Sequence, residues 1–307
     1  MFNLFILKMN NIKSTFSIKD LENLTGIKAH TIRIWEKRYN LLQPERTDTN
    51  IRYYSLANLQ KLLNISYLNN NGYKISKIAS LQSDAIPELV KKVAENDTTN
   101  NHAIDAFKLS MLNFDQKLFY DTYEGLIKEK SFSDIFYQDL IPLLSEIGML
   151  WQTDTITPAH EHFLTSLIRQ KILVNTEIIQ SQNQVNTDKI FVLYLPDNEV
   201  HELGLMVINY EIIAKGHQSI FLGQSVPLES LKDLLNYYDH ITFISYFTVK
   251  PEKEVISDYI KDFSEKIMVK DSINFWILGR MLDEIDLNSL PNQIVPFKTI
   301  KDLVKKL

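Results

Sequence analysis

The apolar positions of the chain follow two different periods along its length. Up to about residue 181 they recur every three to four residues, which predicts amphipathic helices, among them 133–152 and 157–179. After residue 188 the apolar positions instead form short, almost wholly apolar runs separated by amphipathic stretches. Apolar runs of this kind are typical of strands covered on both faces, so the last third predicts a doubly wound parallel sheet. The runs are 190–196, 219–223, 241–247, 275–279 and 294–297.

Two polar runs, 95–101 and 181–188, predict linkers between separate domains. We therefore expect an all-α winged helix-turn-helix domain, a four-helix bundle and an α/β domain. Their expected ranges are 14–83, 100–182 and 188–307.

Glycine and proline residues mark the expected ends and starts of helices in the predicted α/β domain. Gly216 is expected to end its first helix as a C-cap. Pro227 and Pro251 are expected in the first turns of two later helices. In a sheet of this class, ligands bind at the carboxyl ends of the strands.

Residues 16–39 predict two helices joined by a tight turn. Ser17 and Asp20 have the spacing of a capping box, and Gly26 supplies the turn. The two helices share an apolar face formed by Leu21, Leu24, Ile27, Ile32 and Trp35. The second helix directs polar and basic side chains outward, as a recognition helix does. We expect these side chains to contact DNA: Lys28, His30, Thr31, Arg33, Lys37 and Arg38.

Residues 41–55 predict a β wing, two strand-like pieces around a polar turn. Arginine and tyrosine on a wing suit phosphate and sugar contacts, which set affinity and register rather than base preference. The wing residues expected at the DNA are Arg46, Arg52, Tyr53 and Tyr54. Ser55 is then expected to cap a third helix. The inner face of that helix carries Leu56, Leu59, Leu62 and Leu63.

Charge is divided unevenly, although the formal net charge of the chain is only −5. Residues 15–85 hold ten Lys and Arg against six Asp and Glu, a net of +4. Residues 86–307 hold 21 against 32, a net of −11. Such an asymmetry is expected when only the amino-terminal part approaches phosphate groups.

The composition excludes several kinds of chemistry. The 307 residues include no cysteine, which rules out disulfides, thiolate metal sites and cysteine nucleophiles, and which favours a cytoplasmic protein. No apolar run has the length of a membrane span and the apolar start lacks the features of a signal peptide, so we expect no membrane association. No catalytic triad, phosphate-binding glycine loop or carboxylate pair is present, so we predict no catalytic residues and no enzyme.

The amino-terminal domain resembles the MerR-type transcriptional regulators. Its residues 31–62, TIRIWEKRYNLLQPERTDTNIRYYSLANLQKL, follow the recognition helix, wing and next helix of that family almost without gaps. The resemblance implies a homo-oligomer, a dimer or a tetramer, on a palindromic double-stranded operator. Relatives that sense metals use cysteines in a C-terminal segment, and because this chain has none, its signal must enter elsewhere.

One histidine of the predicted α/β domain lies where parallel sheets bind ligands. The first strand ends at Pro196, and His201 lies in the loop before the next helix, with Glu199 before it and Gly204 after it. An imidazole there can ligate a metal through one nitrogen while the other donates to a carboxylate, and a glycine lets a bulky ligand approach. A histidine at a strand end, taken alone, is more often a helix cap.

The combination of Glu199, His201 and Gly204 resembles the cobalamin-binding motif of methionine-synthase-like and mutase domains. In those families the histidine binds cobalt from below, and the cofactor's own base is displaced into a deep slot. The resemblance therefore implies that His201 is the cobalt ligand and that Glu199 orients it.

A second candidate group lies in the predicted bundle. Thr157 and Pro158 predict a helix start, so Glu161 and His162 lie near a helix amino end, where the dipole favours an anion and lowers a histidine pKa. Trp151 ends the helix before, and we expect the Trp, Glu and His side chains to converge. Their spacing resembles the upper-face signature of light-sensing, adenosylcobalamin-dependent MerR regulators of the CarH/LitR type. In these the Trp and Glu contact the adenosyl group, and we expect the His to reach the upper position once that group leaves.

The chain departs from the cobalamin-binding pattern at two positions. Those families continue with Ser-any-Leu and with a Gly-Gly pair that admits the buried base, where this chain has Ser245-Tyr246-Phe247 and Leu278-Gly279. The resemblance implies that Ser245 and Gly279 also contact the cofactor. Phe247 and Leu278 add side chains where the slot should stay open, and overfilling a close-packed site is costly.

Three functions follow from these observations. In the first, the chain is a repressor controlled by adenosylcobalamin and light through a change of oligomer. In the second, the α/β domain is a degenerate relative that binds no cobalamin and responds to a partner protein or another ligand. The third, cobalamin-dependent methyl transfer, needs a substrate domain for which the chain has no room.

Overall fold

The computed structural model describes residues 15–82, 85–94, 100–152, 156–181, 186–287 and 290–307. By its internal contacts the chain divides into two compact units, 1–168 and 169–307. The three domain ranges expected from the sequence stay a prediction. Most of the two polar runs expected to be linkers lies outside the described residues. None of the described helices is long and apolar enough to cross a membrane.

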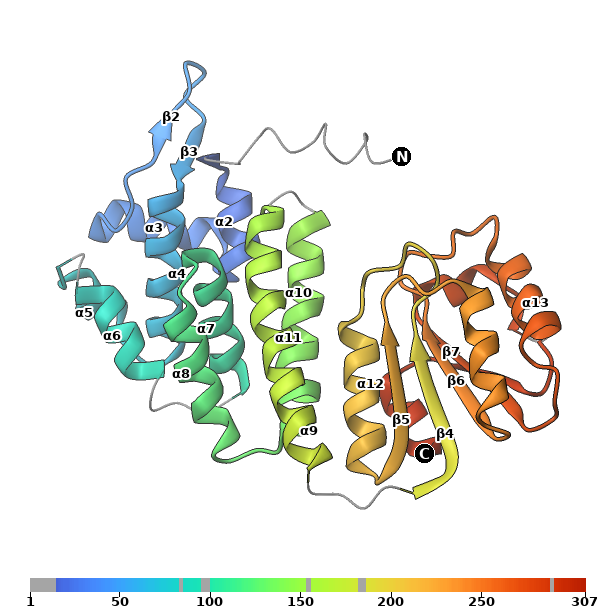
Figure 1. Cartoon of the computed structure of the whole chain (residues 1–307). Coiled ribbons are helices and arrows are strands. Elements are labelled where there is room, and N and C mark those ends of the chain that lie inside the picture. The colour runs from blue at the N-terminus through green and yellow to red at the C-terminus, as the bar shows by residue number, and fades with distance from the viewer. Residues whose placement is uncertain (1–14, 83–84, 95–99, 153–155, 182–185, 288–289) are drawn as a thin grey trace. The chain divides into compact units, whose positions relative to one another are not determined.

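The amino-terminal part folds as a winged helix-turn-helix (Figure 1). Its elements are β1 (Thr15–Phe16), α2 (Ile18–Thr25), α3 (Ala29–Tyr39), β2 (Glu45–Arg46), β3 (Arg52–Ser55) and α4 (Leu56–Asn70). The three strands form an antiparallel sheet in the order β1-β3-β2.

The sequence signals at the ends of these helices are confirmed. Ser17 and Asp20 exchange both hydrogen bonds of a capping box, and Gly26 ends α2 in the left-handed conformation at φ +70°. The Ser55 hydroxyl accepts from the backbone N–H of Asn58 and so caps α4. Leu21 and Ile32 of the expected shared face are fully buried.

The helical part after the winged domain contains the four expected helices, preceded by two short ones. The elements are α5 (Ile75–Ala79), α6 (Ala85–Ala94), α7 (Asn100–Asn113), α8 (Gln116–Ile127), the run α9 (Phe132–Ile135), η1 (Phe136–Leu140) and α10 (Ile141–Gln152), and α11 (Pro158–Gln180). The run from α9 to α10 is one continuous helix in which η1 is a π-helical turn. As expected from Thr157 and Pro158, α11 begins at Pro158.

The last part of the chain is the expected parallel sheet. Its strands are β4 (Asn186–Tyr194), β5 (His217–Gly223), β6 (Ile241–Tyr246), β7 (Ile273–Leu278) and β8 (Ile294–Phe297). They lie in the order β5-β4-β6-β7-β8, and all neighbours are parallel. The order reverses beside β4, and the carboxyl end of such a strand is where a doubly wound sheet binds its ligand.

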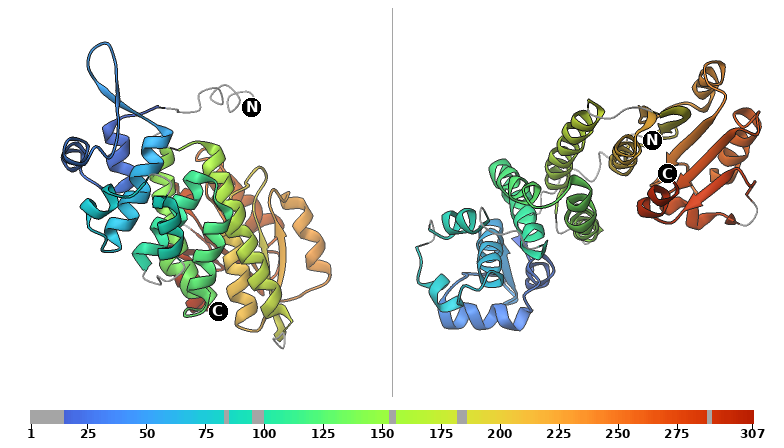
Figure 2. Two further views of the ribbon diagram at one scale, coloured as in Figure 1. Left: turned by 90° about the vertical axis from the view of Figure 1, so that its left-hand side faces the viewer. Right: turned by 90° about the horizontal axis from the view of Figure 1, so that it is seen from below.

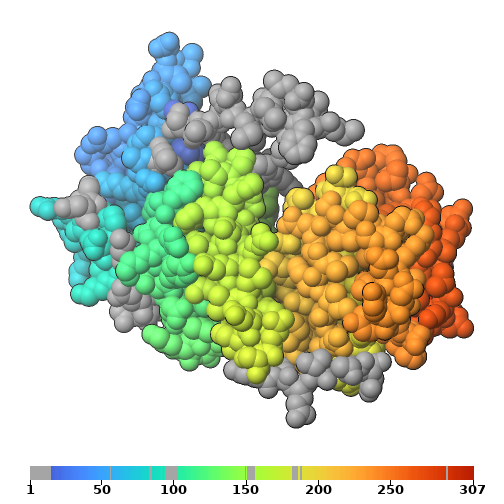
Figure 3. All heavy atoms as spheres, in the orientation of Figure 1, coloured from blue at the N-terminus to red at the C-terminus, as the bar shows by residue number. Residues whose placement is uncertain are grey.

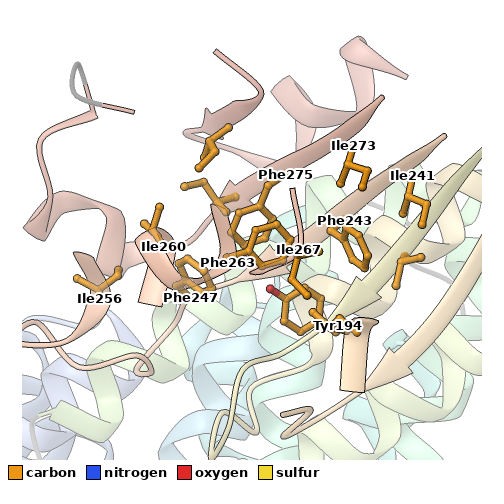
Figure 4. Close-up of a cluster of buried hydrophobic side chains, with 14 of the residues drawn as sticks. Tyr194, Ile241, Phe243, Phe247, Ile256, Ile260, Phe263, Ile267, Ile273 and Phe275 are labelled. Atoms are coloured by element: carbon orange, nitrogen blue, oxygen red, sulfur yellow. The ribbon is translucent and has the colours of Figure 1, made fainter. Parts of the chain in front are cut away.

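Helices cover both faces of this sheet (Figures 1 and 2). They are α12 (Leu203–Ala214), η2 (Leu228–Asn236), α13 (Ile256–Lys266), η3 (Arg280–Glu284) and α14 (Ile300–Lys306). One face carries α12 and α14, which contact each other, and the other carries η2 and α13. The core under α13 is aromatic and includes Tyr194, Phe243, Phe263 and Phe275 (Figure 4).

The three Gly and Pro positions expected at helix ends have different outcomes. Gly216 follows α12 at φ +80°, as expected for a helix end. The expectation for Pro251 is wrong, because α13 begins only at Ile256. The residues just before Pro251 instead form a loop whose backbone N–H groups are used in the site described below. Pro227 precedes a 3-10 helix rather than an α-helix.

Candidate DNA interface and candidate cofactor site

The recognition helix α3 presents the expected polar side chains to solvent. Its buried residue Ile32 packs toward the domain core, while Arg33 and Lys37 are exposed. Lys28, just before the helix, is exposed and lies 3.1 Å from the Glu22 carboxylate, so part of its charge is compensated within the domain. The other expected contacts are exposed at His30 and Arg38 and half-buried at Thr31.

The wing, β2 and β3 with the turn between them, projects from the helices of its domain (Figures 1 and 3). Arg46 is exposed, and its guanidinium donates to the Asn50 side chain at 2.7 Å, which holds it over the turn. The Tyr53 hydroxyl donates to Glu45 at 2.8 Å on the same hairpin. Both residues can reach a phosphate while remaining anchored to the wing.

Glu36 of α3 joins the recognition helix to the wing. Its carboxylate accepts from the Tyr54 hydroxyl at 2.5 Å and lies 3.3 Å from the Arg52 Nε. The Tyr54 ring is fully buried, so we correct the expectation that it contacts DNA: its side chain holds the wing in place. Arg52 stays partly exposed, and its charge is balanced by Glu36.

The Glu199 carboxylate is the centre of the candidate site in the α/β unit. Its side chain is 1% exposed. One oxygen accepts from the backbone N–H of Val200 and of His201 at 2.9 and 3.0 Å. The other accepts from the N–H of Val249 and Lys250 at 2.7 and 2.8 Å. Glu199 thereby joins the loop after β4 to the loop after β6 at the carboxyl edge of the sheet.

These contacts keep Glu199 ionised. Burial alone raises the pKa of this carboxyl, but the hydrogen bonds from His201 and from the backbone of Lys250 and Val249 outweigh it and lower the pKa to about 2. A buried carboxylate at neutral pH is a strong acceptor for an imidazole N–H.

The Glu199 carboxylate orients His201. The Nδ1 atom of His201 lies 2.5 Å from Glu199 Oε1, and the imidazole is 54% exposed. When Nδ1 is protonated and donates to the carboxylate, the lone pair is on Nε2. Metal-binding histidines are often held in this way by a carboxylate that accepts from their other ring nitrogen. No cluster of three or more His, Asp or Glu that could hold a bare metal ion occurs among the described residues.

The amino end of α12 carries a second buried carboxylate. Glu202, next to His201, is 7% exposed at its side chain and lies 2.7 Å from the Arg169 guanidinium of α11. An Arg partner compensates the charge of this buried Glu, which would otherwise be unfavourable.

The space beside Gly204 is filled by the chain itself. A Cβ atom on Gly204 would lie 2.7 Å from the Tyr246 ring. The glycine was expected to admit a bulky ligand, and in the structure it admits this tyrosine. The sequence reasoning missed Tyr246, although its place between Ser245 and Phe247 was a usable signal.

The two departures from the cobalamin-binding pattern lie on opposite faces of the sheet. Phe247 is fully buried in the core under α13 and packs against Phe275 (Figure 4). Leu278 is 1% exposed and pairs in register with Tyr246, on the α12 face. Phe247 and Leu278 therefore do not fill one common slot.

Ser245 and Gly279 were both expected to contact the cofactor. Ser245 is fully buried, and its side chain interacts with that of Tyr194 in the core under α13. Gly279, at φ +117°, has no room for a side chain, because a Cβ atom would lie 2.3 Å from the Phe247 carbonyl oxygen. The absence of a side chain at Gly279 therefore lets the backbone of Phe247 pack closely against it. Among the described residues, His201 thus fits a cobalt ligand, whereas Tyr246 and Leu278 occupy positions on the α12 face.

The expected upper-face residues lie in the other unit. Glu161 and His162 are near the start of α11, and their side chains are 35% and 76% exposed. The Nε2 atom of His162 lies 3.5 Å from Glu161 Oε2. The side chain of Trp151 lies outside the described residues, so its convergence with them stays a prediction. The buried histidine here is His160, which stacks on Phe114 and whose Nδ1 bonds the Thr157 hydroxyl at 2.9 Å.

Two family models match the chain. The model of MerR HTH family regulatory proteins matches residues 16–84, and the B12 binding domain model matches residues 103–174, the bundle from α7 to α11. The chain is 28% identical to the HTH-type transcriptional repressor CarH of Myxococcus xanthus, over 71% of this chain and 73% of that protein. It is 30% identical to the HTH-type transcriptional regulator TnrA of Bacillus subtilis, over 27% of this chain and 80% of that protein.

The chain belongs to the MerR-type helix-turn-helix regulators. Among solved structures, this MerR-type regulator is similar to the Methanosarcina barkeri monomethylamine corrinoid protein. The TM-score is 0.56 at 13% identity, and the match covers 68% of this chain and 98% of that one. At this identity the likeness shows the fold alone, and it agrees with the expected parallel-sheet domain.

Proposed function

We propose that this MerR-type regulator is a repressor whose hold on DNA is controlled by an adenosylated corrinoid ligated at His201. The Glu199–His201 pair carries the proposal. It places an oriented, exposed imidazole at the carboxyl edge of a parallel sheet, where this fold binds ligands. The match of the bundle to the B12 binding domain family supports the same ligand class.

The residues have separate roles in this proposal. His201 holds the metal, Glu199 keeps its lone pair on Nε2, and Trp151, Glu161 and His162 form the upper surface. When bound, an adenosylcorrinoid supplies a weak cobalt–carbon bond that light can break. The protein responds only if its DNA-binding and released states hold the corrinoid with different affinity.

The proposal extends to assembly and DNA. The protein forms a homo-oligomer, a dimer or a tetramer, that binds a palindromic operator. Each pair of subunits contacts the operator through two recognition helices and two wings, because two-fold symmetric proteins match two-fold symmetric sites. The cytoplasm is the proposed location, where operator DNA and adenosylcorrinoids are both available.

A direct test uses the full chain and purified corrinoids in the dark. The protein is mixed with adenosylcobalamin and, separately, with adenosylcobinamide, the same cofactor without its nucleotide tail, and passed through a gel-filtration column. We expect the absorbance of at least one corrinoid to elute with the protein. The His201→Ala variant is expected to lose it, and the control His240→Ala, an exposed histidine outside the site, is expected to keep it.

The regulatory half is tested with DNA selected from a random pool by the dark complex. The operator is expected to be released, with a change in the eluted size of the protein, after illumination. Retention of neither corrinoid by the wild type contradicts the proposed ligand. Release that occurs equally without corrinoid contradicts the proposed control.

A second candidate function is supported by the filled space beside Gly204. In this alternative the α/β domain binds no corrinoid and responds to another ligand. The structure offers a separate hollow of about 300 Å³ beside α13, lined by Ile260, Lys261, Glu265 and Leu290 among others. Operator release that is insensitive to corrinoids and light favours this alternative.

A further inference from the structure

The way a corrinoid would meet His201 decides where its nucleotide tail must go. A corrinoid held by His201 would carry its nucleotide tail on the side of the ring that faces His201. The tail would therefore either enter the domain beside His201 or remain outside it. His201 precedes α12 by two residues, so entry on this side leads between the start of α12 and the ends of β6 and β7.

The first of these positions is occupied by Tyr246. Three atoms of its ring lie 2.7, 3.0 and 3.2 Å from where a Cβ atom of Gly204 would be. The ring thus rests directly on the backbone of the first turn of α12. A tail entering here must displace this half-buried aromatic side chain. Burial raises the pKa of its hydroxyl.

The second position is occupied by Leu278. It lies opposite Tyr246 in the β6–β7 register and is 1% exposed, so the two side chains are neighbours on the α12 face. The adjacent strand residue Ile277 belongs to the core under α13, which confirms that Leu278 faces the other way. A large aliphatic side chain here closes the space that a glycine would leave.

The opposite face offers no alternative entry. Phe247 is packed among Tyr259 and Phe275 at centroid distances of 5.8 and 6.3 Å. The main chain of Phe247 also approaches Gly279 too closely to admit even one further carbon atom between them. Both routes into the domain from the carboxyl edge are therefore filled by the chain itself.

On the basis of the function proposed above, we infer that this site takes corrinoids that lack the lower nucleotide, the cobinamide class, because Tyr246 and Leu278 occupy the place of the displaced base. The imidazole, its carboxylate and the edge of the sheet are left to bind the ring and the metal. Tyr246 and Leu278 are specificity-determining residues in this inference, because they act on the tail and not on the metal.

The experiment compares two aquo-corrinoids, aquocobinamide and aquocobalamin, by titration of the full chain under visible absorbance. The wild type is expected to bind aquocobinamide at least about tenfold more tightly than aquocobalamin, because forcing extra volume into a packed site is costly on that scale. In the double variant Tyr246→Gly, Leu278→Gly, the dissociation constant for aquocobalamin is expected to fall at least about tenfold, while that for aquocobinamide changes little.

A matched control is Ile277→Ala. It removes an equally buried side chain from the same strand on the α13 face, so it reproduces the loss of packing without opening the α12 face. Thermal unfolding of all variants shows whether each is folded. In a folded control, preference for aquocobinamide is expected to be unchanged.

The outcomes separate this inference from the function on which it rests. Tighter binding of aquocobinamide by the wild type, reversed in the double variant and not in the control, supports the inference. Equal binding of the two corrinoids by the wild type overturns it and leaves the proposed ligation by His201 standing. Failure of the wild type to bind either corrinoid overturns both.

Discussion

Two buried carboxylates, one in each unit, hold the functional surfaces of this regulator in different ways. Glu36 in the winged domain is bonded by side chains, the Tyr54 hydroxyl and the Arg52 guanidinium. Glu199 in the α/β unit is bonded mainly by backbone N–H groups from two loops, together with one imidazole. Each joins two segments that are distant in sequence.

The difference shows what each surface needs. Side-chain partners tie the wing to its recognition helix. At Glu199 the partners are mainly backbone N–H groups, so this carboxylate fixes the path of both loops. The position of His201 therefore depends directly on Glu199. We expect substitutions at Glu199 to affect stability and ligand binding together, and those at Glu36 and its partners to affect stability and the wing but not ligand binding.

The largest effect is expected for Glu199→Gln. The amide puts an N–H donor against backbone N–H groups, and the charged acceptor is lost, so the free energy of unfolding is expected to fall by about 3 kcal/mol. Corrinoid affinity is expected to fall by about 10- to 100-fold, as for other carboxylates behind a metal-binding histidine. Urea unfolding and absorbance titration measure the two effects.

Glu36→Gln is the control for this variant. It should leave corrinoid affinity at the wild-type value, since its partners Tyr54 and Arg52 belong to the wing. Equal losses of corrinoid affinity in the two variants would falsify the separation of roles.

Arg33→Ala tests the recognition helix. Arg33 is exposed on α3, so its removal is expected to weaken binding to the selected operator by about 1–3 kcal/mol. Stability is expected to stay within about 0.5 kcal/mol, as for other surface changes. A DNA titration by fluorescence anisotropy measures the first effect. An exposed lysine of the α/β unit, Lys270, provides the matched substitution to Ala, and an equal loss there would contradict base recognition by α3.

Tyr54→Phe tests the connection between the wing and α3. Loss of the hydroxyl removes one partner of Glu36, which is expected to lower the free energy of unfolding by about 1–2 kcal/mol.

Burial, with the hydrogen bond to Glu36, raises the pKa of Tyr54. The folded chain therefore holds this proton more tightly, and stability is lost as pH rises above 10. Chemical unfolding on both sides of pH 10 should show this loss in the wild type only, and an identical loss in the variant would place the effect elsewhere.

The smallest effect is expected at His160. Burial lowers the pKa of this imidazole from 6.5, so below that pH the unfolded chain binds the proton more readily than the folded chain. Its contribution to stability is present above pH 6.5 and is lost as pH falls. His160→Gln removes the titration but retains a residue suited to a capping box with Thr157. Urea unfolding at neutral and at mildly acidic pH should show a smaller acid loss in this variant, and an undiminished loss would assign it to other groups.

Much of the fold could be predicted because its signals are local. The capping box at Ser17, the turn at Gly26 and the helix start at Thr157 each depend on residues within four positions of one another. The five parallel strands were predicted because a strand covered on both faces must be apolar throughout. The start of α13 was predicted wrongly at Pro251, since proline marks a break in the backbone without deciding whether a loop or a helix follows.

The candidate site could be predicted only in part. The pairing of Glu199 with His201 spans two residues and is visible in the sequence. The N–H groups of Val249 and Lys250 come from fifty residues further on, and backbone groups leave no mark on residue type. The burial of Tyr54 was missed for a related reason, because a tyrosine on a wing suits a phosphate contact as well as it suits a buried carboxylate.

The sequence by itself determined the order of the elements, the polar face of the recognition helix and the presence of an imidazole with a neighbouring carboxylate. These follow from periodicity and from the chemistry of adjacent residues. Only the tertiary structure decided that Tyr246 lies on Gly204, that Leu278 and Phe247 face opposite sides of the sheet, and that Glu36 takes Tyr54 out of the DNA surface. These relations depend on which side chains occupy a given buried volume. That is decided only when the layers pack together, because a close-packed interior has room for one arrangement of side chains.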